Sequence, residues 1–361
     1  MPDQNFSLSD FDYHLPETLI AQKPAEPRDH SRLLVYNRSD RSITDDSFFR
    51  LPDYLPENSV MVINNSRVEK ARLLFGKKEV FVTRVIDPKT VEAMIRPGKA
   101  FKAGRTVELS EGSPGDSRFS EPIRAEVLHI SDDGLRTLRF NIPVNEPVFD
   151  PFRRTPFPPY IRPDETLSDR YQTVYARDDG SKAAPTAGLH FTDRIFNALS
   201  HKSIETAELT LHVGLGTFAP VKTENISEHK MHSEWYQISG EAADKLRRAR
   251  HITAVGTTSA RVLESAAHND SLSKTPGNTG GAEHGPFRNF SACEGDTDIF
   301  ITPGYRFRAV DSLITNFHLP KSTLLMMISA FIGIDEMHRI YRHAINEKYR
   351  FYSFGDSMLL L

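Results

Sequence analysis

The hydrophobic and polar positions of the chain follow two patterns. In the N-terminal part and in the second half, short apolar runs predict buried strands, and they alternate with segments whose apolar residues recur at helical spacing. The predicted strands are residues 33–36, 60–63, 171–175, 208–213, 252–255 and 298–301, and the predicted helices are residues 16–21, 46–54, 193–199, 244–250, 256–264, 323–332 and 335–345. This alternation indicates an α/β domain built on a mixed sheet.

Between these regions lies a block of short predicted strands, separated by turn signals such as Asp87-Pro88 and Asp133-Gly134. Such spacing predicts a small antiparallel β-barrel with strands at residues 72–76, 79–86, 91–95, 106–109, 124–128 and 135–140. The following residues 146–163 contain six prolines and predict a stiff return linker. We therefore expect residues 65–152 to form a barrel domain inserted into a discontinuous catalytic domain of residues 1–64 and 153–361.

Composition excludes several classes of protein. Apolar residues make up 39% and charged residues 26% of the 361 residues, which are globular values. The net charge of −3 gives no overall attraction to nucleic acid, and the longest apolar run, residues 324–332, is far shorter than the roughly 20 residues of a membrane-spanning helix. Cys293 is the only cysteine, which excludes a disulfide framework. With no leader peptide visible, we expect a cytoplasmic protein.

Charge is nevertheless uneven, because residues 65–109 carry eleven Lys and Arg against five Asp and Glu. This excess belongs either to a solvated face of the predicted barrel or to a surface that contacts phosphates, and no interleaved aromatic residues decide between the two. The candidates for phosphate contact are Arg67, Arg72, Lys77, Lys78, Lys99 and Lys102.

Two short segments place histidine beside glycine. They are residues 183–192, with Gly188 and His190, and residues 211–218, with His212, Gly214 and Gly216. Glycine allows the backbone to approach a ligand closely, and histidine can donate, accept or carry charge near neutral pH. Structural histidines in a loop and a strand are the alternative. A dinucleotide site is excluded, because the third glycine of that fingerprint is missing after Gly216.

A third segment, Gly256-Thr-Thr-Ser259, joins a predicted strand to a predicted helix. Free amides and the positive end of the helix dipole favour an anion there, and Arg261 in the first turn could add a forked contact. Gly256, Thr257, Thr258 and Arg261 are therefore candidates for binding a carboxylate or phosphate, and plain helix capping is the alternative. No lysine stands in P-loop register, which argues against nucleoside triphosphate hydrolysis.

Two more segments carry polar side chains. His229, His232 and Glu234 could bind a metal, but their spacing differs from that of zinc proteases. Hydrogen bonding of Glu234 to a substrate is a better interpretation than metal binding. A polar strand edge without a functional role is the alternative to substrate binding. Asn316 and His318 precede a predicted helix cap, where α/β proteins place functional residues.

Together these motifs resemble one family, the S-adenosylmethionine:tRNA ribosyltransferase-isomerases of queuosine biosynthesis. The matching segments, in family order, are residues 11–16, 170–176, 183–192, 211–218, 231–234, 255–258, 302–304, 315–325, 349–351 and 354–356. Three features depart from the family pattern. Lys182 replaces a small apolar residue, Asn65 stands where aspartate is usual, and the loop of residues 269–295 is longer.

The resemblance implies a reaction at the wobble position of a tRNA anticodon loop. The ribosyl part of S-adenosylmethionine is transferred to the aminomethyl group of 7-aminomethyl-7-deazaguanine and isomerised, which gives epoxyqueuosine and releases adenine and methionine. S-adenosylmethionine is then a co-substrate, and no prosthetic group, metal, membrane or obligate protein partner is implied.

The resemblance also implies roles for the candidate residues. Proton transfers fall to His190, His212 and His318, without individual assignment. Substrate contacts fall to Gly188, Gly214, Gly216, Glu234, Asn316 and the helix start at 256–261, and the six basic residues would hold tRNA phosphates.

Two other classes stay open. One is a non-catalytic tRNA-binding protein that has lost activity through Lys182 and Asn65, and the other is a metal-dependent hydrolase that uses His229, His232 and Glu234. Release of free adenine separates the transferase from the first, and an active metal-free preparation excludes the second.

Overall fold

The computed structural model describes residues 6–110, 121–214, 221, 223–272 and 289–361. Contacts between Cα atoms group the chain into two compact units. Unit 1 is Met1–Arg67, Pro158–Arg162 and Asp169–Leu361, and unit 2 is Val68–Phe157 and Pro163–Ser168. Unit 2 overlaps the segment that the sequence predicts as an inserted barrel. The assignment of residues 65–152 as an inserted domain stays a prediction.

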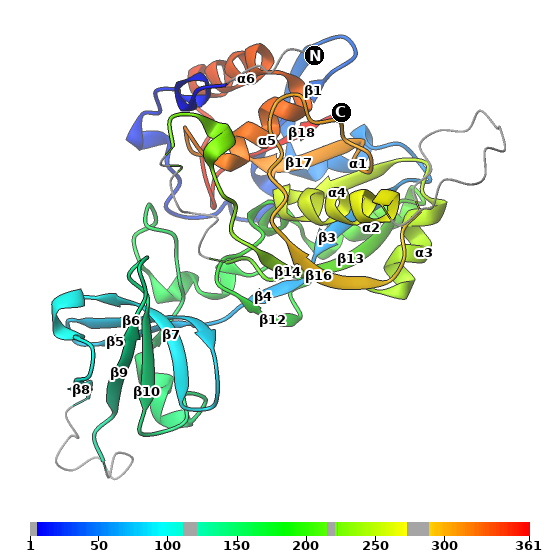
Figure 1. Ribbon diagram of the computed structural model, residues 1–361. Helices are drawn as coiled ribbons and strands as arrows, with labels where there is room; N and C mark the ends of the chain where they lie inside the picture. Colours follow the sequence, from blue (N-terminus) through cyan, green and yellow to red (C-terminus); the bar gives the residue numbers. More distant parts are fainter. Residues whose placement is uncertain (1–5, 111–120, 215–220, 222, 273–288) are drawn as a thin grey trace. The chain divides into compact units, whose positions relative to one another are not determined.

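Unit 1 is built on a nine-stranded sheet (Figure 1). The strand order is β16 (Cys293–Thr297), β14 (Glu234–Ile238), β13 (Glu205–Leu211), β3 (Val60–Asn64), β15 (Ile252–Val255), β17 (Ser312–Asn316), β18 (Ser357–Leu360), β1 (Arg32–Asn37) and β2 (Ser42–Ser47). The four central strands β13, β3, β15 and β17 are parallel, whereas β16, β14, β18 and β2 pair antiparallel with a neighbour. The predicted mixed α/β fold is confirmed.

Alternating side chains give this sheet two apolar faces. Val60 and Val62 of β3 pack into one core with α3 (Gly240–Arg248), α4 (Gly256–Leu272), α5 (Thr323–Ile332) and α6 (Ile334–Asn346). Met61 and Ile63 pack into a second core with α1 (Leu51–Tyr54) and α2 (Asp193–His201). Because helices cover both faces, the ends of the strands carry the loops that are open to ligands.

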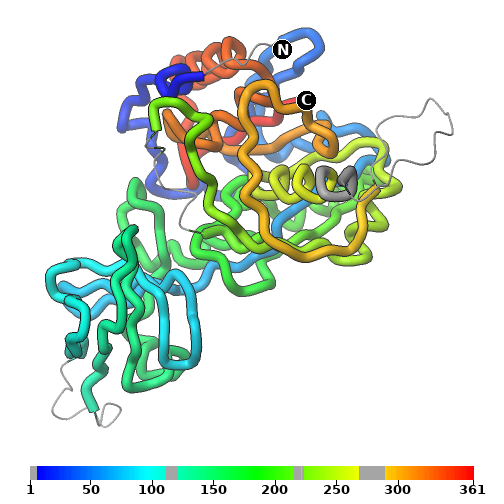
Figure 2. Tube along the Cα trace, in the orientation of Figure 1, coloured from blue at the N-terminus to red at the C-terminus, as the bar shows by residue number. Residues whose placement is uncertain are grey.

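The first and the last strand of the described chain are neighbours in this sheet. β1 and β18 pair in parallel, with Leu33 opposite Ser357. Figure 2 traces the chain from its blue N-terminal part to its red C-terminal part. None of the described helices is long and apolar enough to cross a membrane.

Short 3₁₀ helices form parts of many connections between the described strands and helices. The 3₁₀ turns are η1 (Leu8–Phe11), η2 (Glu17–Leu19), η3 (Arg28–His30), η4 (Phe48–Arg50), η5 (Gly98–Ala100), η6 (Pro147–Phe152), η7 (Glu165–Leu167), η8 (Asp169–Tyr171), η9 (Thr186–His190) and η11 (Ile226–Glu228). A separate two-stranded sheet pairs β4 (Ser66–Val68) with β12 (Asp178–Ser181).

Four predicted elements of unit 1 are wrong. The helix predicted at residues 46–54 is the end of β2, followed by η4 and the single turn α1, because β2 extends along the edge of β1. The strand predicted at 171–175 begins in η8, where Tyr171 is buried without joining a sheet. The strand predicted at 298–301 is irregular and follows the true strand β16, and the helix at 16–21 is only the turn η2.

Unit 2 is a seven-stranded antiparallel sheet around its own apolar core. Its order is β11 (Arg153–Arg154), β5 (Arg72–Phe75), β6 (Lys78–Val85), β7 (Thr90–Arg96), β10 (Arg136–Phe140), β9 (Arg124–Ile130) and β8 (Thr106–Glu108). Phe75, Phe101, Phe140 and Phe149 lie in this core. The end strands β11 and β8 do not pair with each other in the described part of the chain, so the predicted barrel is an open, curled sheet there.

Candidate active site

The candidate site lies where the central parallel strands of unit 1 end. β13, β15 and β17 stop at Leu211, Val255 and Asn316, and each runs directly into a segment that the sequence marks as functional. Loops at the carboxyl ends of parallel strands are the usual ligand sites of open α/β sheets. A cavity of about 60 Å³ lies at this edge, below the roughly 300–1,000 Å³ of typical ligand pockets. A ligand of nucleoside size therefore enters only if the lining side chains move apart.

Six described segments of unit 1 line the cavity. Its lining residues are Tyr160, Ala183, Ala184, Pro185, Thr186, Ala187, Val213, Gly256, Thr257, Thr258, Thr315, Asn316, Phe317, His318, Leu319, Ser322, Leu324, Tyr352 and Ser353. Of the residues selected from the sequence, this set contains Gly256, Thr257, Thr258, Asn316 and His318.

The start of α4 forms one wall. Gly256 has a φ of +86°, a left-handed conformation that turns the chain from β15 straight into the helix and that favours glycine. Thr258 is 9% exposed, and its Oγ1 has no hydrogen-bond partner among the described residues. A buried hydroxyl beside the first amides of a helix can donate to an anion, so this wall has the chemistry of a carboxylate site.

The end of β17 forms the second wall. The Asn316 Nδ2 donates to the carbonyl of Tyr352 at 3.0 Å. The His318 Nε2 lies 2.6 Å from Thr315 Oγ1, and the Tyr13 hydroxyl donates to the His318 carbonyl. Burial lowers the pKa of His318 to about 3 from the usual 6.5, so this imidazole is neutral in the folded protein.

His190 lies behind this wall rather than in it. It ends η9, is 4% exposed, and places Nδ1 2.7 Å from Ser31 Oγ. Burial lowers the pKa of His190 to about 4, and the Asp356 carboxylate opposes this lowering. Gly188 in the same turn is packed tightly, since a Cβ there would lie 2.0 Å from the Tyr175 hydroxyl oxygen.

His212 points elsewhere. Its ring stacks on Trp235 with centroids 5.1 Å apart, and it packs so closely on Gly180 that a Cβ there would lie 2.7 Å from the imidazole. The structure therefore does not bring the three predicted histidines together in the described cavity. His318 lines the cavity, whereas neither His190 nor His212 belongs to its described lining.

Glu234 and Arg261 form a buried ion pair. They are 5% exposed each, Arg261 donates from Nη1 to Glu234 Oε2, and Glu234 Oε1 accepts the Gly214 amide at 2.8 Å. The pair lines a second cavity beside the first, together with Thr257 and Thr258. Because Glu234 already engages the guanidinium, Arg261 is held by the protein rather than presented to a substrate carboxylate as a free cation.

The remaining candidates of unit 1 have structural partners or lie outside the described part. Asn65 accepts from Thr210 Oγ1 at 2.8 Å, and the buried Lys182 donates its amide to Val213. Gly216 lies outside the described residues. His229, His232 and Glu234 all line the second cavity. Within the described residues, no group of three or more His, Cys, Asp or Glu side chains is arranged to hold a metal ion.

The basic candidates for phosphate contact differ in their exposure and in the partners that they already have. Lys77, Lys99 and Lys102 of unit 2 are exposed. Lys78 donates to the Glu108 carbonyl at 2.8 Å, and Arg72 pairs with Glu79 at 3.3 Å. Arg67 belongs to unit 1, where it is exposed and donates to the Ala176 carbonyl at 2.7 Å.

Sequence reasoning missed an aromatic wall of the cavity. Tyr160 and Tyr352 lie with ring centroids 4.7 Å apart, and the Tyr160 hydroxyl is 2.9 Å from Ser353 Oγ. Tyr352 and Ser353 stand between the two matched segments 349–351 and 354–356, which was the available signal. Tyr160 carried no such signal, because it sits in the proline-rich stretch interpreted as a linker.

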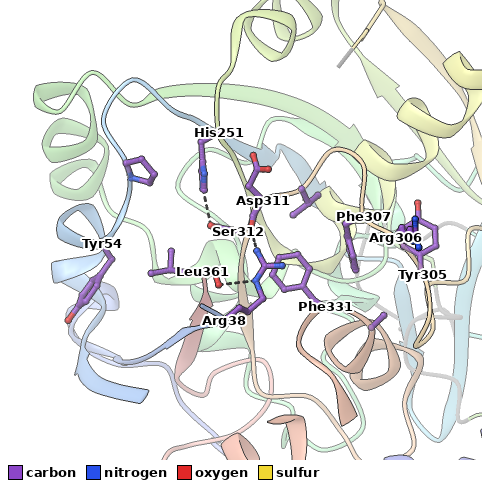
Figure 3. Close-up of a pocket in the computed structure, with 13 residues that line it drawn as sticks. Arg38, Tyr54, His251, Tyr305, Arg306, Phe307, Asp311, Ser312, Phe331 and Leu361 are labelled. Atoms are coloured by element: carbon purple, nitrogen blue, oxygen red, sulfur yellow. Dashed lines mark hydrogen bonds between the residues drawn. The ribbon is translucent and has the colours of Figure 1, made fainter. Parts of the chain in front are cut away.

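A larger cavity of about 800 Å³ opens at the opposite edge, beside the start of β15 and of β17 (Figure 3). Arg38 there donates to the Leu361 carbonyl at 2.9 Å and to the Asp311 carbonyl at 2.5 Å, and it covers the Phe331 ring at 4.0 Å. None of the residues selected from the sequence lines this cavity, so size alone does not identify the site.

The fold and the cavity define an α/β protein with a polar and aromatic pocket at the carboxyl edge of its parallel strands. The family of queuosine biosynthesis proteins matches residues 8–360 of the chain. The chain therefore belongs to this family.

Individual relatives agree over nearly the whole length. An S-adenosylmethionine:tRNA ribosyltransferase-isomerase of Desulfitobacterium hafniense is 47% identical over 367 residues, which are 98% of this chain and 99% of that protein. One of Ralstonia pickettii is also 47% identical and covers 98% and 94%. The crystal structure of an S-adenosylmethionine tRNA ribosyltransferase of Thermotoga maritima is 34% identical, covers 98% and 100%, and has a TM-score of 0.53.

Proposed function

We propose that this chain is an S-adenosylmethionine:tRNA ribosyltransferase-isomerase. The observation that carries the proposal is the agreement with relatives of that name over 98% of the chain. It transfers the ribosyl part of S-adenosylmethionine to 7-aminomethyl-7-deazaguanine in the anticodon loop of a tRNA and isomerises it to epoxyqueuosine. Adenine and methionine leave. S-adenosylmethionine serves as co-substrate without a prosthetic group, and the enzyme acts in the cytoplasm.

The start of α4 is the proposed site for the carboxylate of the methionine portion. Thr258 Oγ1 is buried with no partner among the described residues, and it stands beside the first helical amides. These groups suit an anion because each is a hydrogen-bond donor that an anion satisfies. Glu234 contributes indirectly, by holding Arg261 and the Gly214 amide in place.

The aromatic wall is the proposed site for adenine. Tyr160, Tyr352 and Phe317 line the same cavity, and aromatic rings stack favourably on a purine.

The rearrangement of the ribosyl group needs a proton acceptor. The sulfonium of S-adenosylmethionine makes the C–H of the neighbouring 5′ carbon acidic, so a positioned base can start the rearrangement. His318 is the proposed proton-transfer group, because among the three predicted histidines it is the one in the described lining of the cavity.

The exposed lysines of unit 2 are the proposed contacts to tRNA phosphates. Lys99 and Lys102 are exposed and form no ion pair with another described residue, whereas Arg72 is paired with Glu79. Lys99→Glu combined with Lys102→Glu should weaken tRNA binding and lower its salt slope by about two, since each phosphate contact releases about one counterion. Lys348→Glu, an exposed lysine of unit 1, is the control.

The central experiment measures free adenine after mixing the protein, S-adenosylmethionine and tRNA that carries the deazaguanine precursor. Release that depends on the precursor supports the proposal. Salt-sensitive tRNA binding without adenine release would instead identify a non-catalytic tRNA-binding protein.

Thr258→Ala should raise the KM for S-adenosylmethionine about tenfold, the effect of losing one hydrogen bond to a charged group. Thr106→Ala, at an exposed strand position, is the matched control.

A further inference from the structure

Two buried polar atoms beside the cavity share one feature. Neither His190 Nε2 nor Asn316 Oδ1 has a hydrogen-bond partner of standard geometry among the described residues. The two side chains belong to segments that contact each other, because η9 ends at His190 and β17 ends at Asn316. Asn316 also raises the pKa of His190 against the larger lowering by burial. His190 is 4% exposed and Asn316 2%, so water does not reach these atoms freely.

The orientation of the Asn316 amide follows from its other contact. Nδ2 lies 3.0 Å from the Tyr352 carbonyl oxygen, which can only accept. The opposite orientation would place two oxygens against each other, so Oδ1 is the unsatisfied acceptor of this amide. Oδ1 accepts only, so a hydrogen bond between the two residues requires an N–H on His190 Nε2.

The protonation state of His190 follows in turn. A neutral imidazole carries one N–H, and if Nε2 bears it, Nδ1 is an acceptor. Nδ1 lies 2.7 Å from Ser31 Oγ, whose hydroxyl can donate to it. A bond from Nε2 to Oδ1 would join the Ser31–His190 contact and the Asn316–Tyr352 contact into one continuous chain of donors and acceptors. One N–H of Asn316 Nδ2 is left for the cavity that Asn316 lines.

We propose that His190 is a positioning residue that holds Asn316 as a fixed N–H donor to an acceptor atom of the co-substrate, and that it is not a proton-transfer group. This inference rests on the proposed function, since the co-substrate is S-adenosylmethionine. The Phe48 ring, 5.0 Å from the imidazole, closes the other side of His190. The charged groups that face His190 are the Asp356 carboxylate and the Arg350 and Arg28 guanidiniums.

Two amide substitutions distinguish positioning from proton transfer. In His190→Gln, the side-chain N–H falls near the position of Nε2 and can still donate to Asn316. In His190→Asn, it falls near Nδ1 and cannot. We expect kcat of His190→Asn to be lower than that of His190→Gln by about tenfold to a hundredfold, the usual effect of a misplaced substrate-contacting group. His190→Gln should keep the wild-type shape of the pH profile.

The same pair of variants defines the contrary result. An amide cannot take up a proton near neutral pH, so a proton-transfer role predicts equal, near-complete loss in both. That outcome overturns the inference, provided that both variants keep the wild-type melting temperature. Adding Asn316→Ala to His190→Asn should cause little further loss, because both changes remove the same donor.

A second measurement is independent of activity. In protein with ¹⁵N-labelled histidine, the signals that disappear in His190→Gln belong to His190. They should show the neutral tautomer with its proton on Nε2, and a proton on Nδ1 would overturn the inference. Wild-type protein that releases no adenine yet shows the Nε2–H tautomer contradicts the proposed function instead, so the two failures are distinguishable.

Discussion

Single buried polar groups anchor whole loops in this protein, and Glu264 of α4 is one of them. It is fully buried and accepts the Tyr305 hydroxyl at 2.9 Å. It also accepts the backbone amides of Arg308, Ala309 and Val310 at 2.9 to 3.0 Å. One carboxylate thus satisfies four donors of a connection that has no regular secondary structure of its own.

Glu264→Ala should therefore lower the free energy of unfolding by about 3–5 kcal/mol, because it leaves several buried amides without an acceptor. Urea unfolding measures the change. Glu205→Ala, at an exposed strand position, is the control and should change stability by less than about 0.5 kcal/mol. A loss below about 1 kcal/mol for Glu264→Ala would show that the loop finds other acceptors.

A second residue-scale prediction concerns Gly188. A Cβ at this position would lie 2.0 Å from the Tyr175 hydroxyl oxygen and 2.8 Å from Thr173 Cγ2. Gly188→Ala should destabilise the protein by about 1–3 kcal/mol through overpacking. Tyr175→Phe should be nearly neutral, because the hydroxyl is buried with no partner among the described residues.

The double variant tests the cause. Removing the hydroxyl opens space for the new methyl group, so Gly188→Ala should cost less in the Tyr175→Phe background than in the wild type. Strict additivity of the two free energies would mean that the Tyr175 hydroxyl is not what excludes a side chain at Gly188.

At the scale of elements, α4 is the helix whose start was predicted best. The pattern of small apolar strand, glycine and hydroxyl residues predicts the turn at Gly256, and its φ of +86° shows why glycine is needed there. Edge strands were predicted worst. β2 and β16 carry few apolar residues, and only pairing with β1 and β14 makes them strands.

The start of α4 supplies the element-scale prediction. Gly256→Ala should lower the free energy of unfolding by about 1–2 kcal/mol, because a Cβ disfavours the left-handed conformation. Gly240→Ala, at the start of α3, is a matched control with no atom within 4 Å of the new Cβ. It should be neutral or stabilise by up to about 1 kcal/mol. Similar losses in both, measured by urea unfolding, would contradict the strain at Gly256.

At the scale of the whole molecule, two buried histidines make stability depend on pH. Burial lowers the pKa of His190 to about 4 and of His318 to about 3, from 6.5. Below pH 6.5 the unfolded chain takes up protons that the folded protein does not, so stability falls as the pH is lowered toward these values. Near about pH 5 we expect a loss of about 2 kcal/mol for each histidine relative to about pH 7.

Urea unfolding followed by fluorescence measures this loss, because Trp235 is the only tryptophan and reports on unit 1. His190→Gln should shrink the difference between the two pH values by about 2 kcal/mol. His14→Gln, which changes an exposed histidine, is the control. An undiminished difference in His190→Gln would contradict the burial argument for His190.

The sequence by itself determined the alternation of strands and helices, the α4 turn, and the family to which the motifs point. These depend on local spacing and on the few residues that tolerate a special backbone conformation. Tertiary structure alone decided which candidates share a cavity. It placed His318 and Thr258 in the lining, His190 against Ser31, and His212 on Trp235. The reason is that the direction of a side chain at the end of a strand is set by packing between elements far apart in the chain.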